Sequence, residues 1–308
     1  MSTTEDAEDA SLAERLAGKH AQLSPAERRV AEYLRDHLPE IIFATAEEIG
    51  AATETSDATV VRTAKSLGYS GLPELKRGVG RQVVGATTPS ALLGKRIDSA
   101  GQQTASLLDH VFTEAAERLA ETRRLIPERD FVAAVDLIAG AREVVSFGIG
   151  PSELPARYLS LRLRRLGQSA RMIGNTGFLL ADELLGLREP DVVVLYAPGR
   201  LINDITVLLD QVRTVGARAI LISDSLGPTL ADRIAISLPA VQSAAGYTDE
   251  GLSALLLTDC LVLGVAGRER ERATATSELL NSLRSALTNQ PAPRAPRRRR
   301  TGPRKETR

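Results

Sequence analysis

The sequence predicts an α/β fold class in two parts: an all-α N-terminal domain, then a three-layer αβα domain with a five-stranded parallel sheet. Two observations predict this organisation. Residues 24–84 contain a succession of helix-start signals at short intervals. From residue 128 onward, short apolar runs alternate with helical stripes, which favours a parallel sheet covered on both faces. The 308-residue length is sufficient for two hydrophobic cores.

Composition excludes several classes of protein. No apolar run approaches the roughly 20 residues that a membrane span needs. The N-terminus has neither the basic start nor the apolar centre of a signal peptide. The single cysteine, Cys260, allows no intrachain disulfide and is interpreted as a small buried apolar residue. We therefore expect a cytoplasmic protein with no membrane contact, no metal site and no cofactor.

The net charge of zero conceals two charged ends. We expect residues 1–20 to be an acidic disordered N-terminus. Residues 288–308 are rich in proline and arginine, a composition that buries no core and predicts a disordered basic tail. This tail either strengthens DNA association through nonspecific phosphate contacts or serves only as a solubilising segment.

The first two helices of the N-terminal part are marked by capping boxes. Ser24-Pro25-Ala26-Glu27 places a cap residue, a first-turn proline and the reciprocal glutamate in order. Val30 and Leu34 continue this helix on its buried side, and Pro39 is expected to help close it. Thr45-Ala46-Glu47-Glu48 repeats the capping box and starts a short helix.

A third helix is predicted from Asp57 to Leu67, with Ser56 as its cap and Gly68 as its left-handed terminator. A fourth helix follows through Leu72 and Leu75. Two short helices joined by a tight turn form a helix-turn-helix, whose second helix enters the DNA major groove. Residues 21–84 are therefore predicted to bind double-stranded DNA. The alternative is a helical subdomain used only for packing.

The N-terminal half of the third helix is expected to read base edges. Arg62 can form a bidentate guanine contact, and Thr59 can meet a thymine methyl group or a phosphate. Thr59, Thr63 and Ser66 are expected to face outward with it. Basic residues further along are expected to contact phosphates, with Arg81 among them. The predicted DNA-binding residues are Ser56, Asp57, Thr59, Arg62, Lys65, Ser66, Lys76 and Arg77.

The second domain is assigned to residues 102–287, after a small, polar linker at 85–101. Its first helix, about 102–121, is expected to pack on this domain or on a partner subunit. The predicted strands cover residues 143–147, 169–173, 191–196, 218–223 and 233–238. The other predicted helices cover residues 131–139, 154–166, 177–185, 202–215 and about 248–287.

The first strand runs into Gly148-Ile149-Gly150-Pro151-Ser152 and then a helix. Glycines allow close approach of a ligand, and the helix N-terminus offers free N–H groups to an anion. A dinucleotide fingerprint is disfavoured, because Glu153 occupies its third glycine position and Gly174-Asn175 lacks the ribose-binding acid. The remaining alternative is a tight turn that binds nothing.

The residues LSPAERRVAEYLRDHLPEIIFATAEEIGAATETSDATVVRTAKSLGYSGLPELKRGVGRQV resemble the N-terminal domain of RpiR/MurR-type regulators. The stretch ATVVRTAKSLGYSGLPELK is the most specific part. This chain has Glu54 where that family usually has a glycine in the turn, and Thr55 where it has an apolar residue. A non-glycine residue in a left-handed turn costs about 1 kcal/mol, so we expect a shifted or strained turn.

Residues 125–287 resemble a sugar-isomerase (SIS) domain, through VVSFGIGPSELPARYLSLRLRRLGQSARM and the later strands from Asp191 onward. That family's third strand usually ends in a Ser-x-Ser-Gly-x-Thr phosphate loop. Here the aligned residues run from Tyr196 to Leu201, so the three hydroxyls are lost and Arg200 is the candidate to compensate. The resemblance implies a ligand site at Gly148, Gly150, Ser152, Gly199 and Arg200.

The combined resemblance implies a transcriptional regulator, not an enzyme. Its SIS-type domain would sense a carbohydrate-derived effector, with sugar phosphates among the candidates, and modulate binding to a palindromic operator as a homodimer or homotetramer. Besides a structural carbohydrate-binding protein with a vestigial DNA reader, two alternatives remain open. One is a sugar-phosphate isomerase-like enzyme, for which Glu183, Glu250 and His110 are acid–base candidates by type alone. The other is a regulator with a degenerate sensor that binds no ligand.

Overall fold

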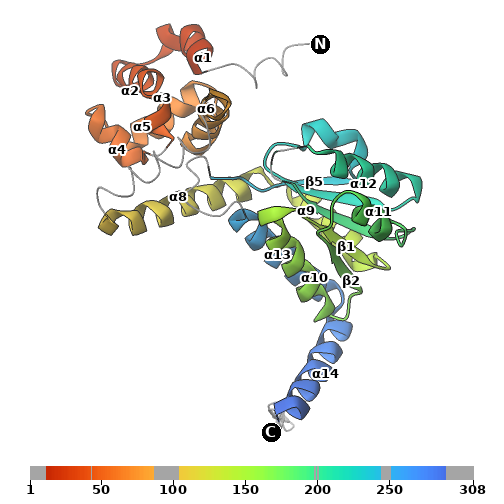
Figure 1. Ribbon diagram of the computed structural model, residues 1–308. Helices are drawn as coiled ribbons and strands as arrows, with labels where there is room; N and C mark the ends of the chain where they lie inside the picture. Colours follow the sequence, from red (N-terminus) through yellow and green to blue (C-terminus); the bar gives the residue numbers. More distant parts are fainter. Residues whose placement is uncertain are drawn as a thin grey trace, which may run out of the picture.

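A computed structural model describes residues 12–42, 44–86, 104–197, 199, 201–243 and 251–288. Helices make up the N-terminal part, and a sheet with helices on both faces makes up the second part, with α8 running between them (Figure 1). The predicted two-part fold is confirmed. Residues 87–101 of the predicted linker and residues 289–308 of the predicted basic tail lie outside the described ranges.

The N-terminal domain contains six helices and one short 3-10 turn within the described residues. Both predicted capping boxes form: the Ser24 Oγ accepts from the Glu27 backbone N–H at 3.3 Å, and the Thr45 Oγ1 from that of Glu48 at 3.2 Å. These bonds satisfy donors at the helix ends that have no partner within the helix. The elements are α1 (Leu12–Lys19), η1 (His20–Gln22), α2 (Pro25–Asp36), α3 (Leu38–Ile41), α4 (Ala46–Ala52), α5 (Asp57–Ser66) and α6 (Leu72–Ala86).

Helix α1 corrects the expectation that residues 1–20 are disordered. Leu12 and Leu16 lie one turn apart on one face and are buried in the core of the domain. Arg15 donates from Nη1 to the Gly68 carbonyl at 3.2 Å and stacks over the Tyr69 ring. The acidic composition of the preceding residues conceals this short amphipathic repeat.

Close packing fixes the geometry of α4, the turn and α5. A Cβ atom added to Gly50 would lie 3.0 Å from the Thr55 carbonyl oxygen, so the turn passes directly over α4. Glu54 has a φ of 53°, which confirms the expected strained, left-handed residue in the turn. Arg29 of α2 clasps this turn, because its Nε donates to the Thr53 carbonyl at 3.3 Å. Its Nη2 also donates to the Glu54 carbonyl at 3.5 Å.

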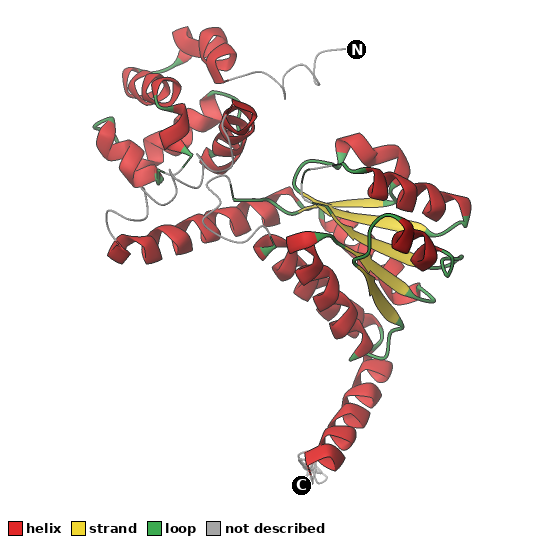
Figure 2. Cartoon of the chain, in the orientation of Figure 1, coloured by secondary structure: helices red, strands yellow, loops and turns green. Residues whose placement is uncertain are grey.

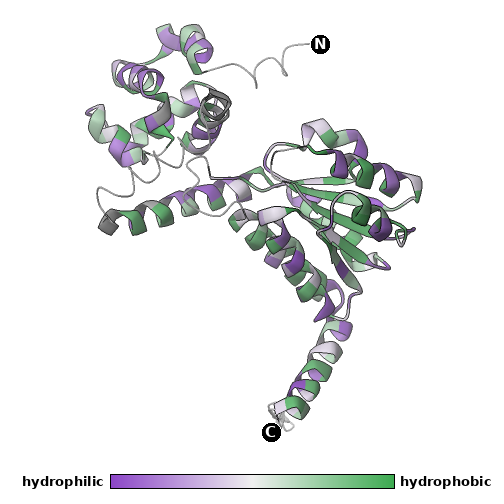
Figure 3. Ribbon diagram, viewed as in Figure 1, coloured by the Kyte–Doolittle hydropathy of each residue, from purple (hydrophilic) through white to green (hydrophobic). Residues whose placement is uncertain are grey.

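The five strands of the second domain form one parallel sheet in the order β2-β1-β3-β4-β5. The strands are β1 (Val144–Phe147), β2 (Ala170–Ile173), β3 (Val192–Tyr196), β4 (Arg218–Ser223) and β5 (Ile236–Pro239). The central strands β1, β3 and β4 are mostly apolar and almost completely buried, as expected for strands covered on both faces, whereas the edge strands β2 and β5 are partly buried (Figure 3). The fifth strand was predicted at 233–238 and begins later, because Pro228–Arg233 form a 3-10 helix, η3.

Helices cover both faces of the sheet, which gives the predicted three layers (Figure 2). One layer contains α9 (Glu128–Gly140), α10 (Glu153–Arg164) and α13 (Leu252–Arg268), and the other contains α11 (Phe178–Leu184) and α12 (Asn203–Thr214). The remaining elements are α8 (Thr104–Leu125), η2 (Gly150–Ser152) and α14 (Arg270–Thr288), which extends away from the domain. Cys260 on α13 is exposed, which corrects the expectation that it is buried.

Replacing Glu54 by glycine is expected to stabilise the N-terminal domain. Glycine adopts a positive φ without the steric cost of Cβ, so the free energy of unfolding should rise by about 1 kcal/mol or less. Urea unfolding of the full chain measures the change. The control is Glu54→Ala, which keeps the Cβ atom and should give no such gain. Equal effects of the two substitutions would show that the turn stores no backbone strain.

Candidate functional site

Helix α5 presents the predicted base-reading end to solvent. Ser56, Asp57, Arg62 and Lys65 are exposed on it. Ser56 is the N-cap, and its Oγ accepts from the Thr59 backbone N–H at 3.2 Å. The Arg62 Nη2 donates to the Thr59 Oγ1 at 3.2 Å, and this hydrogen bond positions the Arg62 side chain. A basic side chain and a capped helix end therefore face outward at the position where a recognition helix meets base edges.

Three other predicted outward-facing residues of α5 have structural roles. Thr59 and Thr63 are buried, and the Thr63 Oγ1 donates to the Thr59 carbonyl at 2.9 Å. The buried face of α5 is therefore wider than the apolar stripe alone indicates. Ser66 donates to the Glu27 Oε1 at 2.9 Å. The pKa of Glu27 is lowered, above all by the Ser24 hydroxyl. The Ser24 backbone, Ser66 and Arg62 lower it further.

Lys76 and Arg77 are placed away from the DNA-reading face, which corrects their assignment as phosphate contacts. Lys76 is only 6% exposed and faces α8, where burial lowers its pKa against the opposing effect of Glu117 and Glu114. Arg77 reaches the second domain, with its Nη1 2.9 Å from the Asp224 Oδ1. These two cations therefore belong to the contact between domains. The side chain of Arg81 lies outside the described residues.

The sheet order creates a site at its carboxyl edge. The connections from β1 and β3 leave this edge in opposite directions, which is the point where open α/β sheets bind ligands. A small pocket that opens to solvent lies at that edge, with an internal volume of about 20 Å³. It is lined by Ser152, Pro155, Tyr196, Ala197, Ile222, Ser223, Ala240, Gln242, Gly251 and Ala254.

The predicted glycine-rich loop forms one wall of this pocket. Gly148 cannot carry a side chain, because its Cβ would lie 2.2 Å from the Ser152 carbonyl oxygen. Gly150 has a φ of +60°, and Ser152 lines the pocket without capping α10. The loop therefore delivers a hydroxyl beside the N-terminus of α10, which favours an oxygen-rich ligand.

The loop after β3 contributes differently from the prediction. Gly199 lies beside the β4 loop, since an added Cβ would be 3.2 Å from the Ser225 Oγ. Arg200 and Pro198 lie outside the described residues. Tyr196 closes the floor of the pocket, and its hydroxyl is 2.6 Å from the Thr258 Oγ1 of α13. Burial raises the pKa of this phenol, so Tyr196 supplies a neutral wall.

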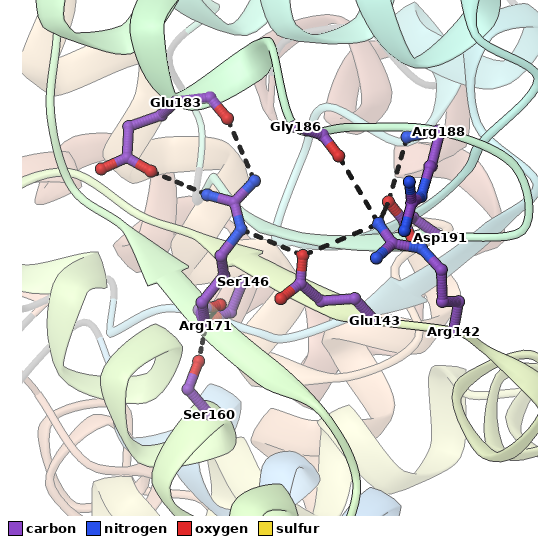
Figure 4. A network of polar contacts seen from close by, with 9 residues as sticks. All are labelled: Arg142, Glu143, Ser146, Ser160, Arg171, Glu183, Gly186, Arg188 and Asp191. Carbon is purple, nitrogen blue, oxygen red and sulfur yellow. Dashed lines mark hydrogen bonds and ion pairs between the residues drawn. The ribbon is translucent and has the colours of Figure 1, made fainter.

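The acid–base candidate Glu183 is held in an ion-pair network instead of the pocket (Figure 4). Its Oε2 is 2.7 Å from the Arg171 Nη1, and the Arg171 Nε in turn bonds Glu143 at 3.1 Å. Arg142 extends the network to Asp191 at 2.6 Å. Glu250 and the side chain of His110 lie outside the described residues. Among the residues that the structure describes, neither a carboxylate nor an imidazole lines the pocket.

The sequence reasoning missed Ser223, Gln242 and Asp224. Ser223 ends β4, and Asp224 and Gln242 follow β4 and β5, so the rule that ligands bind beyond the carboxyl ends of parallel strands could have indicated them. The described residues also contain no group of three or more His, Cys, Asp or Glu side chains that could hold a metal ion. Of the helices in the described ranges, none combines the length and apolar composition that crossing a membrane requires.

Residues 10–83 match the model of the helix-turn-helix domain of the rpiR family. The uncharacterized HTH-type transcriptional regulator YbbH of Bacillus subtilis is 26% identical over 261 residues, which are 83% of this chain and 90% of YbbH. The bifunctional protein glk of Paraburkholderia xenovorans is 26% identical over 277 residues. That match covers 89% of this chain but 42% of glk, so the chain spans less than half the length of that relative.

Two solved structures resemble the fold. The sugar isomerase domain of an RpiR transcription factor from Sphaerobacter thermophilus is 25% identical, with a TM-score of 0.54 over 57% of this chain and 99% of that domain. NanR of Vibrio vulnificus, solved as a complex with ManNAc-6P, is 21% identical. Its TM-score is 0.52, over 89% of this chain and 99% of that one. The α/β domain therefore has the sugar-isomerase fold.

Two lysines should differ in their effect on DNA binding. Lys65 is exposed on α5, whereas Lys76 is buried against α8. Each phosphate contact contributes about 0.9 to the slope of log K against log salt, so Lys65→Gln should reduce that slope by about 1. Lys76→Gln removes the same charge and should leave the slope unchanged. Titrations at several salt concentrations test this, and equal slopes for the two variants would contradict the placement of Lys76.

Gly148→Ala should distort the pocket loop. Its new Cβ would clash with backbone, so the loop must shift, at a cost of about 1–3 kcal/mol in unfolding free energy. The matched control is Gly140→Ala at the end of α9, where an added Cβ meets nothing within 4 Å. Thermal unfolding of both variants provides the measurement. A Gly148→Ala protein as stable as the control would show that the loop is free to rearrange.

Proposed function

We propose that the chain is an RpiR-type regulator, in which a helix-turn-helix domain precedes a SIS-type domain. We propose further that it binds operator DNA through α5 and responds to a carbohydrate derivative. One observation carries this proposal. The same chain contains an exposed helix of the recognition type and a pocket at the switch point of a parallel sheet. The ligand occupies this pocket and modulates operator binding.

The chemistry of the pocket indicates the class of effector. Its described polar residues are Ser152, Ser223, Gln242 and Tyr196, all of which are uncharged, and the hydroxyl of Tyr196 is engaged by Thr258. Neutral donors and acceptors among small apolar residues suit the hydroxyl and acetamido groups of a sugar derivative. The N-terminus of α10 adds backbone N–H groups that can donate to the oxygens of a phosphate. NanR of Vibrio vulnificus, a structural relative, was solved with ManNAc-6P.

We propose no catalytic turnover. A sugar isomerase needs a positioned acid–base group, and Glu183 is engaged by Arg171 away from the pocket. Self-association is part of the proposal, with a homodimer or homotetramer binding a palindromic operator in the cytoplasm. Leu108 and Phe112 on α8 and Leu279 and Leu283 on α14 expose apolar surface that supports it.

Fluorescence polarisation with the chain's own upstream DNA tests the proposal directly, at a fixed salt concentration. We expect sequence-selective binding that at least one member of a panel of sugars, acetamido sugars and their phosphates shifts. Selective binding that no compound shifts would retain the DNA function and indicate a degenerate sensor. Weak, salt-sensitive binding that is equal on all sequences, together with isomerase turnover, would contradict the proposal and favour the enzyme.

Arg62→Ala should weaken selective binding by about 5- to 150-fold, since a bidentate guanine contact contributes about 1–3 kcal/mol. Arg129→Ala is the control, because Arg129 is 87% exposed on α9 of the other domain. It should leave the affinity unchanged. Retention of full selectivity by Arg62→Ala would mean that α5 does not read bases through this residue.

A further inference from the structure

A second hollow lies between the two domains and shares one residue with the carboxyl-edge pocket. It is bounded by α6 and α8 and by the segment that follows β5. Its lining residues are Ile42, Pro73, Lys76, Arg77, Glu114, Glu117, Arg118, Val241 and Gln242. Gln242 also lines the carboxyl-edge pocket. Gln242 therefore lies between the two hollows.

Asp224, which follows β4, joins this residue to the DNA-binding domain. Its Oδ1 accepts from the Arg77 Nη1 at 2.9 Å and from the Gln242 backbone N–H at 3.3 Å. The side chains of Arg77 and Asp224 are only 12% and 13% exposed, so water screens their attraction weakly. The Asp224 Oδ1 therefore binds both Arg77 of α6 and the backbone of Gln242 in the wall of the pocket.

The wall segment is tied to three other elements. The Ala240 backbone N–H donates to the Ser223 carbonyl at 2.9 Å, which continues the sheet. The Val241 backbone N–H donates to the Thr122 Oγ1 of α8 at 3.1 Å, and the Ser253 Oγ of α13 donates to the Val241 carbonyl at 2.8 Å. A displacement of this segment must therefore act on α8 and on Asp224 together.

The amide nitrogen of the Gln242 side chain is available as a hydrogen-bond donor. Its Nε2 is buried and, within the part of the chain that the structure describes, has no hydrogen-bond partner. Buried amide nitrogens without a partner are rare in folded proteins and indicate a missing acceptor. A hydroxyl or carbonyl oxygen of a ligand in the carboxyl-edge pocket would supply that acceptor.

We propose that Gln242 is a ligand-binding residue that transmits occupancy of the pocket to the DNA-binding domain through Asp224 and Arg77. An oxygen of the sugar derivative accepts from the Gln242 Nε2 and draws the residue toward the pocket. The Gln242 backbone N–H then moves away from Asp224. The strength of the ion pair between Asp224 and Arg77 of α6 changes as a result. This inference rests on the proposed function for the identity of the ligand, but the contact with Arg77 can be tested without any ligand.

The ligand-free test reverses the charges of the pair in the full chain. Arg77→Asp and Asp224→Arg should each raise the hydrogen-exchange rate of α6 amides by about tenfold or more, and the double variant should restore protection. The control is the exposed Arg268–Asp136 pair, 2.7 Å apart, whose reversal should leave α6 unchanged. Single variants with wild-type exchange, or a double variant without rescue, would overturn the coupling.

The second test uses N-acetylmannosamine 6-phosphate, N-acetylmannosamine and glucosamine 6-phosphate as probes. We expect Gln242→Ala to reduce the thermal shift that a probe produces by about half or more, and Gln211→Ala on α12 to preserve it. Asp224→Ala should keep the thermal shift but lose the effect of the probe on DNA affinity. An Asp224→Ala protein whose DNA binding still responds like the wild type would overturn the coupling.

Failure of the inference and failure of the proposed function give different results. A wild-type chain whose DNA binding and stability respond to no probe would contradict the sensing function and, with it, the role of Gln242 as a ligand-binding residue. A responsive wild-type chain with a failed charge reversal would overturn only the path through Asp224 and Arg77.

Discussion

The parallel arrangement of the strands is the constraint on which the candidate site depends. Because all five strands run in one direction, the segments that follow β1, β3, β4 and β5 converge at a single edge. Ser152, Tyr196, Ser223 and Gln242 come from four parts of the sequence and meet there for this reason alone. The same edge faces α8 and the N-terminal domain, so the pocket and the domain contact are built from adjacent residues of the same segments (Figure 1).

The contact between domains also explains why basic residues are a poor guide to the DNA surface. Lys76 and Arg77 follow the recognition helix closely in sequence, yet α6 turns them toward acidic partners on α8 and after β4. Burial of charged groups is costly unless each has a partner of opposite charge. Glu121 satisfies this condition, since Arg124 above all, with Ser70 and Arg77, lowers its pKa.

The fold could be predicted from the sequence almost completely, because its signals are local. The capping boxes at Ser24 and Thr45 and the apolar strand from Val192 are each contained in a few consecutive residues. The strained turn at Glu54 could also be expected, but only from the family resemblance, because that family usually has a glycine at this position. The helix at Leu12 could not, because two leucines are a weak signal beside an acidic segment.

The site was harder to predict, because burial and partners are properties of the whole chain. Gly148 and Ser152 could be identified from the loop motif. The roles of Thr59 and Arg77 could not, because a side chain's neighbours across a domain contact leave no local pattern. Gln242 lies four residues beyond the predicted end of the fifth strand at residue 238, and no local motif marks it.

The clasp of Arg29 on the turn after α4 has a consequence for how such a protein can be controlled. Arg29 joins α2 to the turn before α5, and Gly50 leaves no space between α4 and the turn, so we expect the recognition helix to resist tilting by itself. We therefore expect the domain to move as one unit. A signal that reaches the domain can then change the position and angle of α5, but not the shape of the surface that meets the base pairs.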